Sequence, residues 1–212
     1  MRGLLLMSSF AVATAILMFG AFSVIPYISA SYVSNAGVTE AQLPVIFVAG
    51  GLLTLVSTPL VGRPIDRYGA LPVFRCAVSL AAVMTLVVTH LPSVGLAVAA
   101  PVAALMMASN AGRLVSSVSL ITASIEPRRR GGFMSVNSSV QHIASGLGTV
   151  CGGLILEGGA GEPLRYFGTV GMLAVAVTLT SLWFAGRVRH GRLRGPPITG
   201  VASMLSHGSR HE

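Results

Sequence analysis

Long apolar stretches alternate with short polar breaks along most of this chain. Six stretches approach or exceed the ~20 residues that a helix needs to cross a bilayer. They cover roughly residues 4–33, 43–61, 73–89, 94–122, 133–156 and 167–185, and the breaks between them are rich in Gly, Pro, Ser and charge. Because lipid offers the backbone no hydrogen-bond partners, we predict that all six stretches are helices. The expected fold is all-α, an integral membrane bundle of six transmembrane helices within residues 1–186.

The two ends of the chain each carry a feature that the apolar stretches do not explain. Residues 187–212 contain a Gly-Pro-Pro run with several Ser and His and have little to bury, so we predict a disordered basic tail. At the other end, Arg2 and the small residues Ser29 and Ala30 resemble a secretory signal. The apolar run exceeds the 7 to 15 residues expected of a signal core, and five more stretches follow it. We therefore predict that this segment is retained as the first span.

Composition and charge sharpen this picture. The chain is 53% apolar and only 9% charged, whereas a soluble domain usually carries about a quarter charged residues, so an ordinary soluble globule is excluded. All 14 basic residues are arginines, and 12 of them fall on one side of the six-span arrangement. Since a positive excess marks the cytoplasmic side, both termini are predicted to be cytoplasmic. No basic face interleaved with aromatic residues is present, so the net charge of +8 does not indicate nucleic-acid binding.

The break after the second stretch carries a specific motif. Residues 62–69 read Gly-Arg-Pro-Ile-Asp-Arg-Tyr-Gly, with Gly62, Asp66, Arg67 and Gly69 at its defining positions. This spacing resembles the signature loop of the major facilitator superfamily, in which two further basic residues usually follow. Here Ala70 and Leu71 stand in those places, which thins the charge network. The resemblance implies that Asp66 and Arg67 form part of a latch that holds one conformation of a transporter closed.

Further stretches resemble the C-terminal half of bacterial sugar- and drug-efflux members of this family. They are residues 22–28, similar to a seventh helix, and the basic turn 126–131 with the following residues 133–138, similar to the loop between a tenth and an eleventh helix. A complete member has twelve spans in two halves, so the resemblance implies that this chain is one half. Gly148, Gly152 and Gly153 resemble the antiporter motif of exporters, with Thr149 in place of its proline. Small residues at such spacing also mark close helix packing.

Polar residues inside the apolar stretches point to a transport path, because they are costly in lipid unless they face a cavity or a partner. Arg113 lies 14 residues before Pro127 and Gln141 lies 14 residues after it, so an antiparallel helix pair places both at about the same depth. The candidate path residues are Asn110, Arg113, Asn137, Gln141 and His142. Arg113 would attract an anionic group or tune a proton site, and His142 would titrate near neutral pH. Alternatively, Arg113 snorkels or pairs with helix-end carbonyls, and the amides and His142 join helices within the half.

Enzyme classes find no support in these stretches. All six acidic residues lie in breaks or tails, and Walker loops, metal-ligand clusters and a Schiff-base lysine are missing from the sequence. No catalysis, cofactor or metal is therefore expected. If transport is coupled to protons, either His142 carries the proton or the acid belongs to a missing half.

The resulting hypothesis is a multi-pass transporter of the inner (plasma) membrane that works by alternating access. It would export a small solute such as a sugar or a drug, with proton coupling left open. Its expected partners are the lipid bilayer, the solute, and a second copy or a missing N-terminal half. Two alternatives stay open: a truncated or non-transporting half that acts as a membrane interaction module, and a homodimeric half-transporter.

Overall fold

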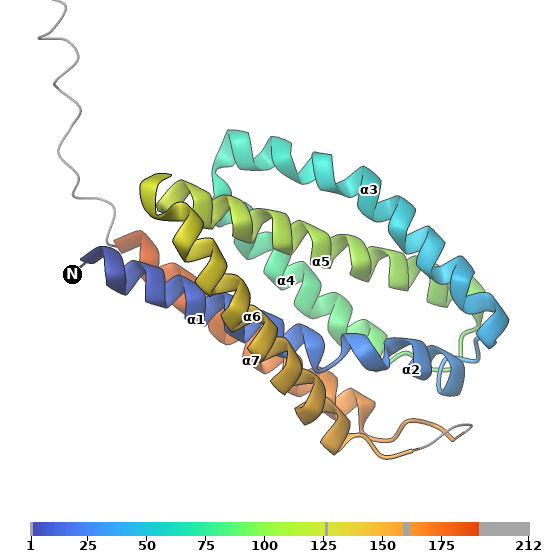
Figure 1. Cartoon of the computed structure of the whole chain (residues 1–212). Coiled ribbons are helices and arrows are strands. Elements are labelled where there is room, and N and C mark those ends of the chain that lie inside the picture. Colours follow the sequence, from blue (N-terminus) through green and yellow to red (C-terminus); the bar gives the residue numbers. More distant parts are fainter. Residues whose placement is uncertain (1, 126, 159–161, 191–212) are drawn as a thin grey trace, which may run out of the picture.

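The computed structural model describes residues 2–125, 127–158 and 162–190, and over these ranges it is helical without a β-strand (Figure 1). The long helices are α1 (Arg2–Phe22), α3 (Leu43–Tyr68), α4 (Ala70–Thr89), α5 (Leu96–Ser124), α6 (Pro127–Ile155) and α7 (Phe167–His190), and the short ones are η1 (Ile25–Tyr27), α2 (Ile28–Ser34) and η2 (Glu40–Gln42). The predicted all-α fold is confirmed. The predicted disordered tail is wrong for residues 187–190, which belong to α7, and from position 191 onward it lies outside the described residues.

Four segments within these ranges are long and apolar enough to cross a membrane: Ser8–Ser34, Glu40–Tyr68, Ala70–Thr89 and Leu96–Thr122. The apolar part of α7 that the structure describes, Phe167–Leu182, is shorter. Helix α6 has 29 residues, yet it begins with three arginines and carries many polar side chains. The chain is therefore a membrane protein with several apolar helices, while the count of six crossings stays a prediction.

Two of the predicted breaks are partly helical. Residues 62–68 were expected in a break, but α3 continues through them to Tyr68. Likewise, residues 127–132 were expected in a break, but α6 begins at Pro127. In both places the apolar pattern stops before the helix does, because a membrane helix can extend beyond the lipid into water while its composition becomes polar. Gly and Pro were interpreted as turn signals in segments that remain helical.

The first apolar stretch is not one continuous helix. α1 ends at Phe22, and the 3-10 turn η1, which contains Pro26, connects it to α2. Proline lacks an N–H group and therefore cannot make an α-helical hydrogen bond at its own position. The chain changes helix type there without leaving the bundle: Ser23 Oγ donates to the carbonyl oxygen of Gly20 at 2.9 Å, and Tyr27 Oη donates to that of Thr149 at 2.7 Å.

The long helices form two groups of three (Figure 1). α1 packs against α6 and α7, whereas α5 packs against α3 and α4, and α4 joins the two groups by packing on α7. α5 and α6 meet only near their shared turn and then diverge (Figure 1). Each group therefore combines early and late helices of the chain. The two groups are built alike, because α1 packs against two later helices, α6 and α7, and α5 packs against two earlier ones, α3 and α4.

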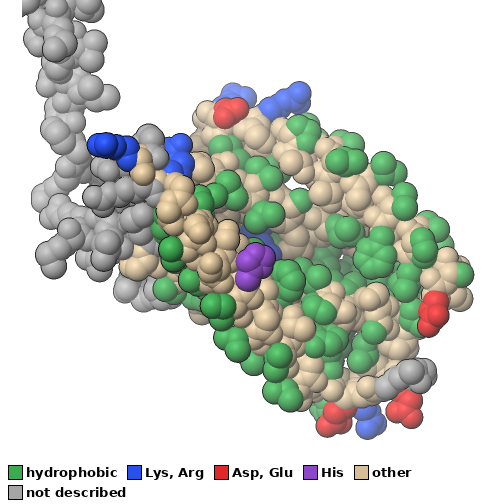
Figure 2. Space-filling model, in the orientation of Figure 1, with side chains coloured by type: hydrophobic (Ala, Val, Ile, Leu, Met, Phe, Trp, Pro, Cys, Tyr) green, Lys and Arg blue, Asp and Glu red, His purple; other side chains and the backbone are tan. Residues whose placement is uncertain are grey.

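Arginines gather at the end of the bundle where the α3–α4 turn, the α5–α6 turn and the start of α1 lie, which we call the arginine end (Figures 1 and 2). Arg63, Arg67 and Arg75 flank the first of these turns, and Arg128 and Arg130 lie in the first turn of α6. Figure 2 shows charged side chains at both ends and hydrophobic ones over the middle of this face. This banding fits a protein surrounded by lipid at its middle.

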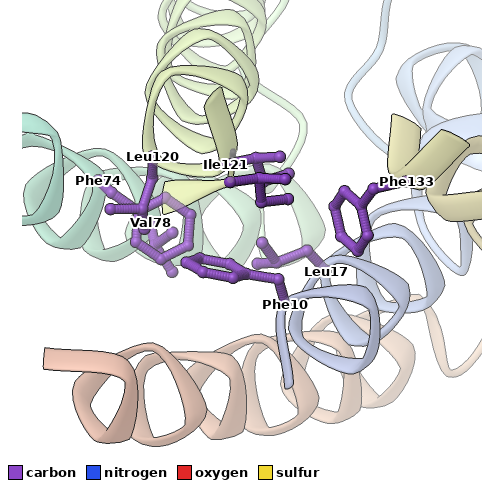
Figure 3. Packing of buried hydrophobic residues seen from close by; sticks show 8 residues of the cluster. Phe10, Leu17, Phe74, Val78, Leu120, Ile121 and Phe133 are labelled. Atoms are coloured by element: carbon purple, nitrogen blue, oxygen red, sulfur yellow. The ribbon is translucent and has the colours of Figure 1, made fainter. Parts of the chain in front are cut away.

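A buried hydrophobic cluster ties four helices together near the arginine end (Figure 3). α1, α4, α5 and α6 contribute Phe10, Leu17, Phe74, Val78, Leu120, Ile121, Ile125 and Phe133. Arg130 closes the adjacent turn, since its Nη2 donates to the carbonyl oxygen of Thr122 at 2.7 Å at the end of α5. An arginine side chain at this position satisfies a carbonyl that has no partner within the helix.

Glycines allow α6 to approach α1 closely. A Cβ atom at Gly148 would meet the backbone of Phe19, and one at Gly152 would meet the backbone of Ser23. Contacts of this kind leave no room for a side chain, as in small-xxx-small packing between membrane helices. The glycines at 148 and 152 therefore have a packing role in this fold, which was the structural alternative to the antiporter resemblance.

We expect Gly69→Ala to destabilise the protein by about 1–3 kcal/mol. Gly69 ends α3 with φ 88° and ψ 159°, a region that is essentially restricted to glycine. The matched control is Gly62→Ala, because Gly62 lies within α3 with open space around its Cα, where alanine favours the helix. Thermal unfolding of the purified variants in detergent measures both effects. Equal midpoints for the two variants would contradict the assignment of strain to Gly69.

Candidate functional site

A small polar cavity lies where α5 and α6 diverge, with α1 along its side. Its volume is about 110 Å³. α5 contributes Arg113, Leu114, Ser117, Val118 and Ile121, α6 contributes Met134, Asn137, Ser138 and Gln141, and α1 contributes Thr14, Leu17 and Met18. Arg113, Asn137 and Gln141 thus line one cavity, as the antiparallel arrangement of their helices about residue 127 predicts.

Arg113 is buried and has no side-chain partner among the described residues. Its side chain is only 6% exposed and lines the cavity. Within the part of the chain that the structure describes, its guanidinium makes no hydrogen bond and no ion pair, and only its backbone carbonyl accepts a bond, from Ser116. A pairing of Arg113 with helix-end carbonyls, one form of the structural alternative, is therefore not formed among these residues. A buried charge without a partner carries a large desolvation cost, so the fold does not gain stability from this residue.

Polar groups surround this cation on the other two helices. Asn137 is 3% exposed, and its Oδ1 accepts a hydrogen bond from Thr14 Oγ1 at 2.7 Å, which links α6 to α1. The hydroxyl of Thr14 also lies 3.0 Å from the carbonyl oxygen of Phe10. Since the Asn137 oxygen accepts from Thr14, the amide nitrogen of this cavity-lining residue is left as a donor. Together with the half-buried Gln141, the cavity presents hydrogen-bond donors beside a positive charge.

We expect Thr14→Val to lower the free energy of unfolding by about 1 kcal/mol, because it removes the hydroxyl donor and leaves a buried amide oxygen without its partner. Valine matches threonine in shape, so packing changes little. Thr14→Ser keeps the hydroxyl and serves as the control. Chemical unfolding in detergent compares the two. Identical stabilities for the valine and serine variants would show that the bond to Asn137 adds nothing to the fold.

The other two candidate path residues lie elsewhere. Asn110 donates from Nδ2 to the carbonyl oxygen of Met106 at 3.1 Å and lines a second, larger cavity of about 310 Å³. His142 is exposed and is not part of the lining of either cavity. The sequence places these polar residues at a similar depth in the membrane. Depth alone does not determine which side of each helix they lie on, and so does not show whether they line the same cavity.

The second cavity contains residues that the sequence did not single out. It lies between α2, α3 and α5 and is lined by Ile25, Ile28, Tyr32, Phe47, Thr54, Ala103, Met106, Met107 and Asn110. The hydroxyls of Tyr32 and Thr54 are buried there without a hydrogen-bond partner. Sequence reasoning passed over both because a lone Tyr or Thr in an apolar run has no visible partner; an unsatisfied hydroxyl becomes apparent only when the surrounding helices are placed.

The signature-motif residues lie at the arginine end. Gly62, Asp66 and Arg67 occupy the last two turns of α3, and Gly69 follows the helix. Asp66 and Arg67 are both exposed, and the Arg67 guanidinium lies 5.3 Å from the centre of the Tyr68 ring. Among the residues whose side chains are described, Asp66 has no ion-pair partner. Both charges are therefore free to engage a partner outside these residues.

The hydrophobic cluster near the arginine end adjoins the cavity around Arg113. Leu17 and Ile121 belong to both the cluster and the cavity lining. Phe10 precedes Leu17 on α1 and Phe133 lies near the start of α6, so both are closer to the arginine end than the cavity is. Figure 3 shows both side chains in the cluster with Leu17 and Ile121. Apolar side chains therefore separate the polar cavity from that end of the bundle.

Comparison with protein families gives one match. A family model described as Major Facilitator Superfamily matches residues 10–207. No curated protein and no solved structure matches the chain significantly. The matched range includes every residue that lines the two cavities and the whole of the signature motif.

Proposed function

Because this chain belongs to the major facilitator superfamily, a family of membrane transporters, we propose that it exports a small solute such as a sugar or a drug by alternating access. The observation that carries this proposal is the cavity around Arg113, where a buried cation with no partner in the described part of the chain lines a space beside amides and hydroxyls. A charge kept in such a place at a cost in stability is typical of a substrate or ion path.

The proposed topology has six crossings, with α6 and α7 as the fifth and sixth and both termini on the cytoplasmic side of the inner (plasma) membrane. The arrangement of helices supports it: α1 with its two partners repeats α5 with its own two, as expected for inverted three-helix repeats within one half. The clustering of arginines at one end supports the orientation.

We further propose that these helices act as one half of a two-half transporter. α3 and α6, which flank the cavities on either side, expose large apolar side chains along much of their length, among them Leu55, at 72% exposure, and Leu154, at 81%. A second copy of the chain or a separate N-terminal half would complete the bundle around the path. Cross-linking in native membranes, through cysteines introduced at these two positions, discriminates the homodimer from a non-transporting monomeric half.

Export is tested directly by untargeted mass spectrometry of cells and medium, with and without expression of the chain at a known membrane level. A solute that falls in the cells and rises in the medium on expression supports export. Unchanged solute pools in cells that carry the folded protein would contradict it. Repeating the measurement at two external pH values, with His142→Gln as a variant, tests whether this histidine couples transport to protons.

We expect Asp66→Asn to slow transport about fivefold without altering the amount of folded protein. By the family resemblance Asp66 belongs to a closing latch, and losing one surface ion pair removes about 1 kcal/mol from the closed state, a factor of about five. The control is Glu157→Gln, an exposed acid in the connection between α6 and α7 at the other end of the bundle. Equal rates for both variants and the unmodified chain would remove Asp66 from the mechanism.

A further inference from the structure

The two cavities lie along the same face of α5. Ala103, Met107 and Asn110 line the larger cavity, and Leu114, Ser117 and Ile121 line the smaller one. These six positions follow one another at steps of four and three residues, which is the spacing of a single helix face. Asn110 and Arg113 are less than one turn apart, about 4.5 Å along the axis at ~1.5 Å per residue. The cavities are therefore stacked end to end along α5.

The opposite side of both cavities is also shared. Thr14 and Met18 on α1 line the smaller cavity, and Ile25, Ile28 and Tyr32 beyond the helix break line the larger one. Within each helix these positions are one turn apart, Thr14 with Met18 on α1 and Ile28 with Tyr32 on α2. We treat the two adjacent cavities as the two parts of one groove along α1, α2 and α5, with α3 beside its larger part and α6 beside its smaller part.

The two parts of this groove differ in chemistry. The smaller part holds the Arg113 cation with the amides of Asn137 and Gln141. The larger part is lined mainly by aliphatic, thioether and aromatic side chains, including Met107 and Phe47, and adds the unsatisfied hydroxyl of Tyr32. Methionine and aromatic side chains adapt to flat or irregular apolar ligands. A ligand that fits both parts has a charged group and an apolar body.

The charge that balances Arg113 does not come from the described part of this chain. Glu40, Asp66, Glu157 and Glu162 are all exposed at the helix ends or connections. Burying an unpaired cation is strongly unfavourable, and folding has already met this desolvation cost. An anion that enters the cavity therefore meets a cation that need not be desolvated again. The cavity volume of about 110 Å³ is that of a few water molecules at ~30 Å³ each, enough for one carboxylate-sized group.

Building on the proposed export function, we propose that the solute is an amphipathic organic anion. Its carboxylate or similar group binds Arg113 and accepts hydrogen bonds from the amides of Asn137 and Gln141. Its apolar body extends along α5 into the larger cavity, where Tyr32 Oη lies within the binding surface. Sugars lack the charge, and cationic drugs carry the wrong sign, so both bind this groove more weakly than such an anion.

The test measures equilibrium binding of radiolabelled 2-naphthoate to the purified full chain in lipid nanodiscs, beside two ligands of the same apolar body, 2-naphthalenemethanol and 2-naphthylmethylamine. We expect the carboxylate to bind at least about tenfold more tightly than the alcohol or the amine, the size of a charged hydrogen bond. This comparison uses the unmodified protein and does not depend on the folding of a variant. Equal binding of the alcohol, stronger binding of the amine, or no binding of naphthoate overturns the proposal.

Variants then assign the preference to the cavity. Arg113→Gln should remove the tenfold preference for naphthoate while leaving the affinity for the alcohol unchanged, and Arg113→Lys should keep part of it. Arg75→Gln, at an exposed arginine of α4, is the matched control and should change neither affinity. A preference that survives Arg113→Gln in protein of normal elution behaviour overturns the assignment.

A lipid headgroup is the other source of an anion with an apolar body. Nanodiscs of phosphatidylcholine alone and of phosphatidylcholine with phosphatidylglycerol separate the two sources. Equal naphthoate affinity in both supports a solute site, whereas loss of naphthoate binding in the anionic discs identifies a lipid headgroup as the occupant and overturns the solute assignment. Binding without export of naphthoate from cells would contradict the transport function alone, and export of neutral solutes without naphthoate preference would contradict the anion alone.

Discussion

Arg113→Ala is expected to lower the export rate at limiting solute concentration by about 30-fold or more. Truncating one partner of a buried charge pair costs about 2–5 kcal/mol, and 2 kcal/mol already corresponds to about 30-fold. The structure gives the reason: the guanidinium is buried, faces the cavity between α1, α5 and α6, and has no partner among the described side chains. Its attraction is therefore available to a ligand. The measurement is solute efflux from cells matched for membrane expression.

The same position should behave in the opposite way in a stability measurement. Arg113→Met keeps most of the side-chain volume and removes a buried charge that nothing in the described chain compensates, so the unfolding midpoint should stay the same or rise. A residue that holds the helices together would instead lower it. Arg113→Lys should retain part of the export, and Arg75→Ala should retain all of it. Full export by Arg113→Ala, or a large loss of stability in Arg113→Met, would exclude the ligand role.

Gly152→Leu is expected to destabilise the protein by about 3 kcal/mol or more and to reduce the yield of folded protein. A side chain at this position on α6 would meet the backbone of Ser23, and backbone cannot move aside as the end of a side chain can. Insertion of large groups into tight packing typically costs 1–3 kcal/mol, and contact with backbone places this case at the upper end. The helices would separate at the point where α1 gives way to η1.

The control for this substitution lies on the same helix. Gly146 has open space around its Cα, so Gly146→Leu brings the same gain of about 1 kcal/mol in helix propensity without the collision. Heating both variants in detergent and measuring the remaining monodisperse fraction by size-exclusion chromatography gives their relative stability. If Gly152→Leu survives heating as well as Gly146→Leu, then α6 does not depend on its close approach to α1.

Much of the fold is visible in the sequence because lipid restricts the backbone to helices. The six apolar stretches, the breaks between them and the one-sided distribution of arginines all follow from composition along the chain. The boundaries near Gly62 and Arg128 do not, since Gly, Pro and Arg are read as turn residues whereas helices α3 and α6 include them. Lipid thickness sets where apolar residues must stop, and helices are free to continue beyond it.

The candidate site was predictable in part. Equal distance from the turn at 127 places Arg113 and Gln141 at one depth, and both line one cavity. Depth does not say which face of a helix meets its neighbours. The sequence therefore could not show that His142 and Asn110 lie outside the cavity that Arg113, Asn137 and Gln141 line. Thr14 was invisible for another reason: its bond to Asn137 joins residues 123 positions apart, and a single apolar helix gives no sign of such a partner.

The packing of α1 against α6 and α7 has a consequence for synthesis of the protein. Helix α1 leaves the ribosome before α6 and α7, the two helices it packs against, have been made. Thr14 waits 123 residues for Asn137, which is about 6–25 s at translation rates of 5–20 residues per second. During that time the surface of α1 that later packs against the glycines of α6 is exposed to lipid or to the insertion machinery. A nascent chain that stops after α5 would therefore be a target for membrane quality control, with α1 still without its packing partners.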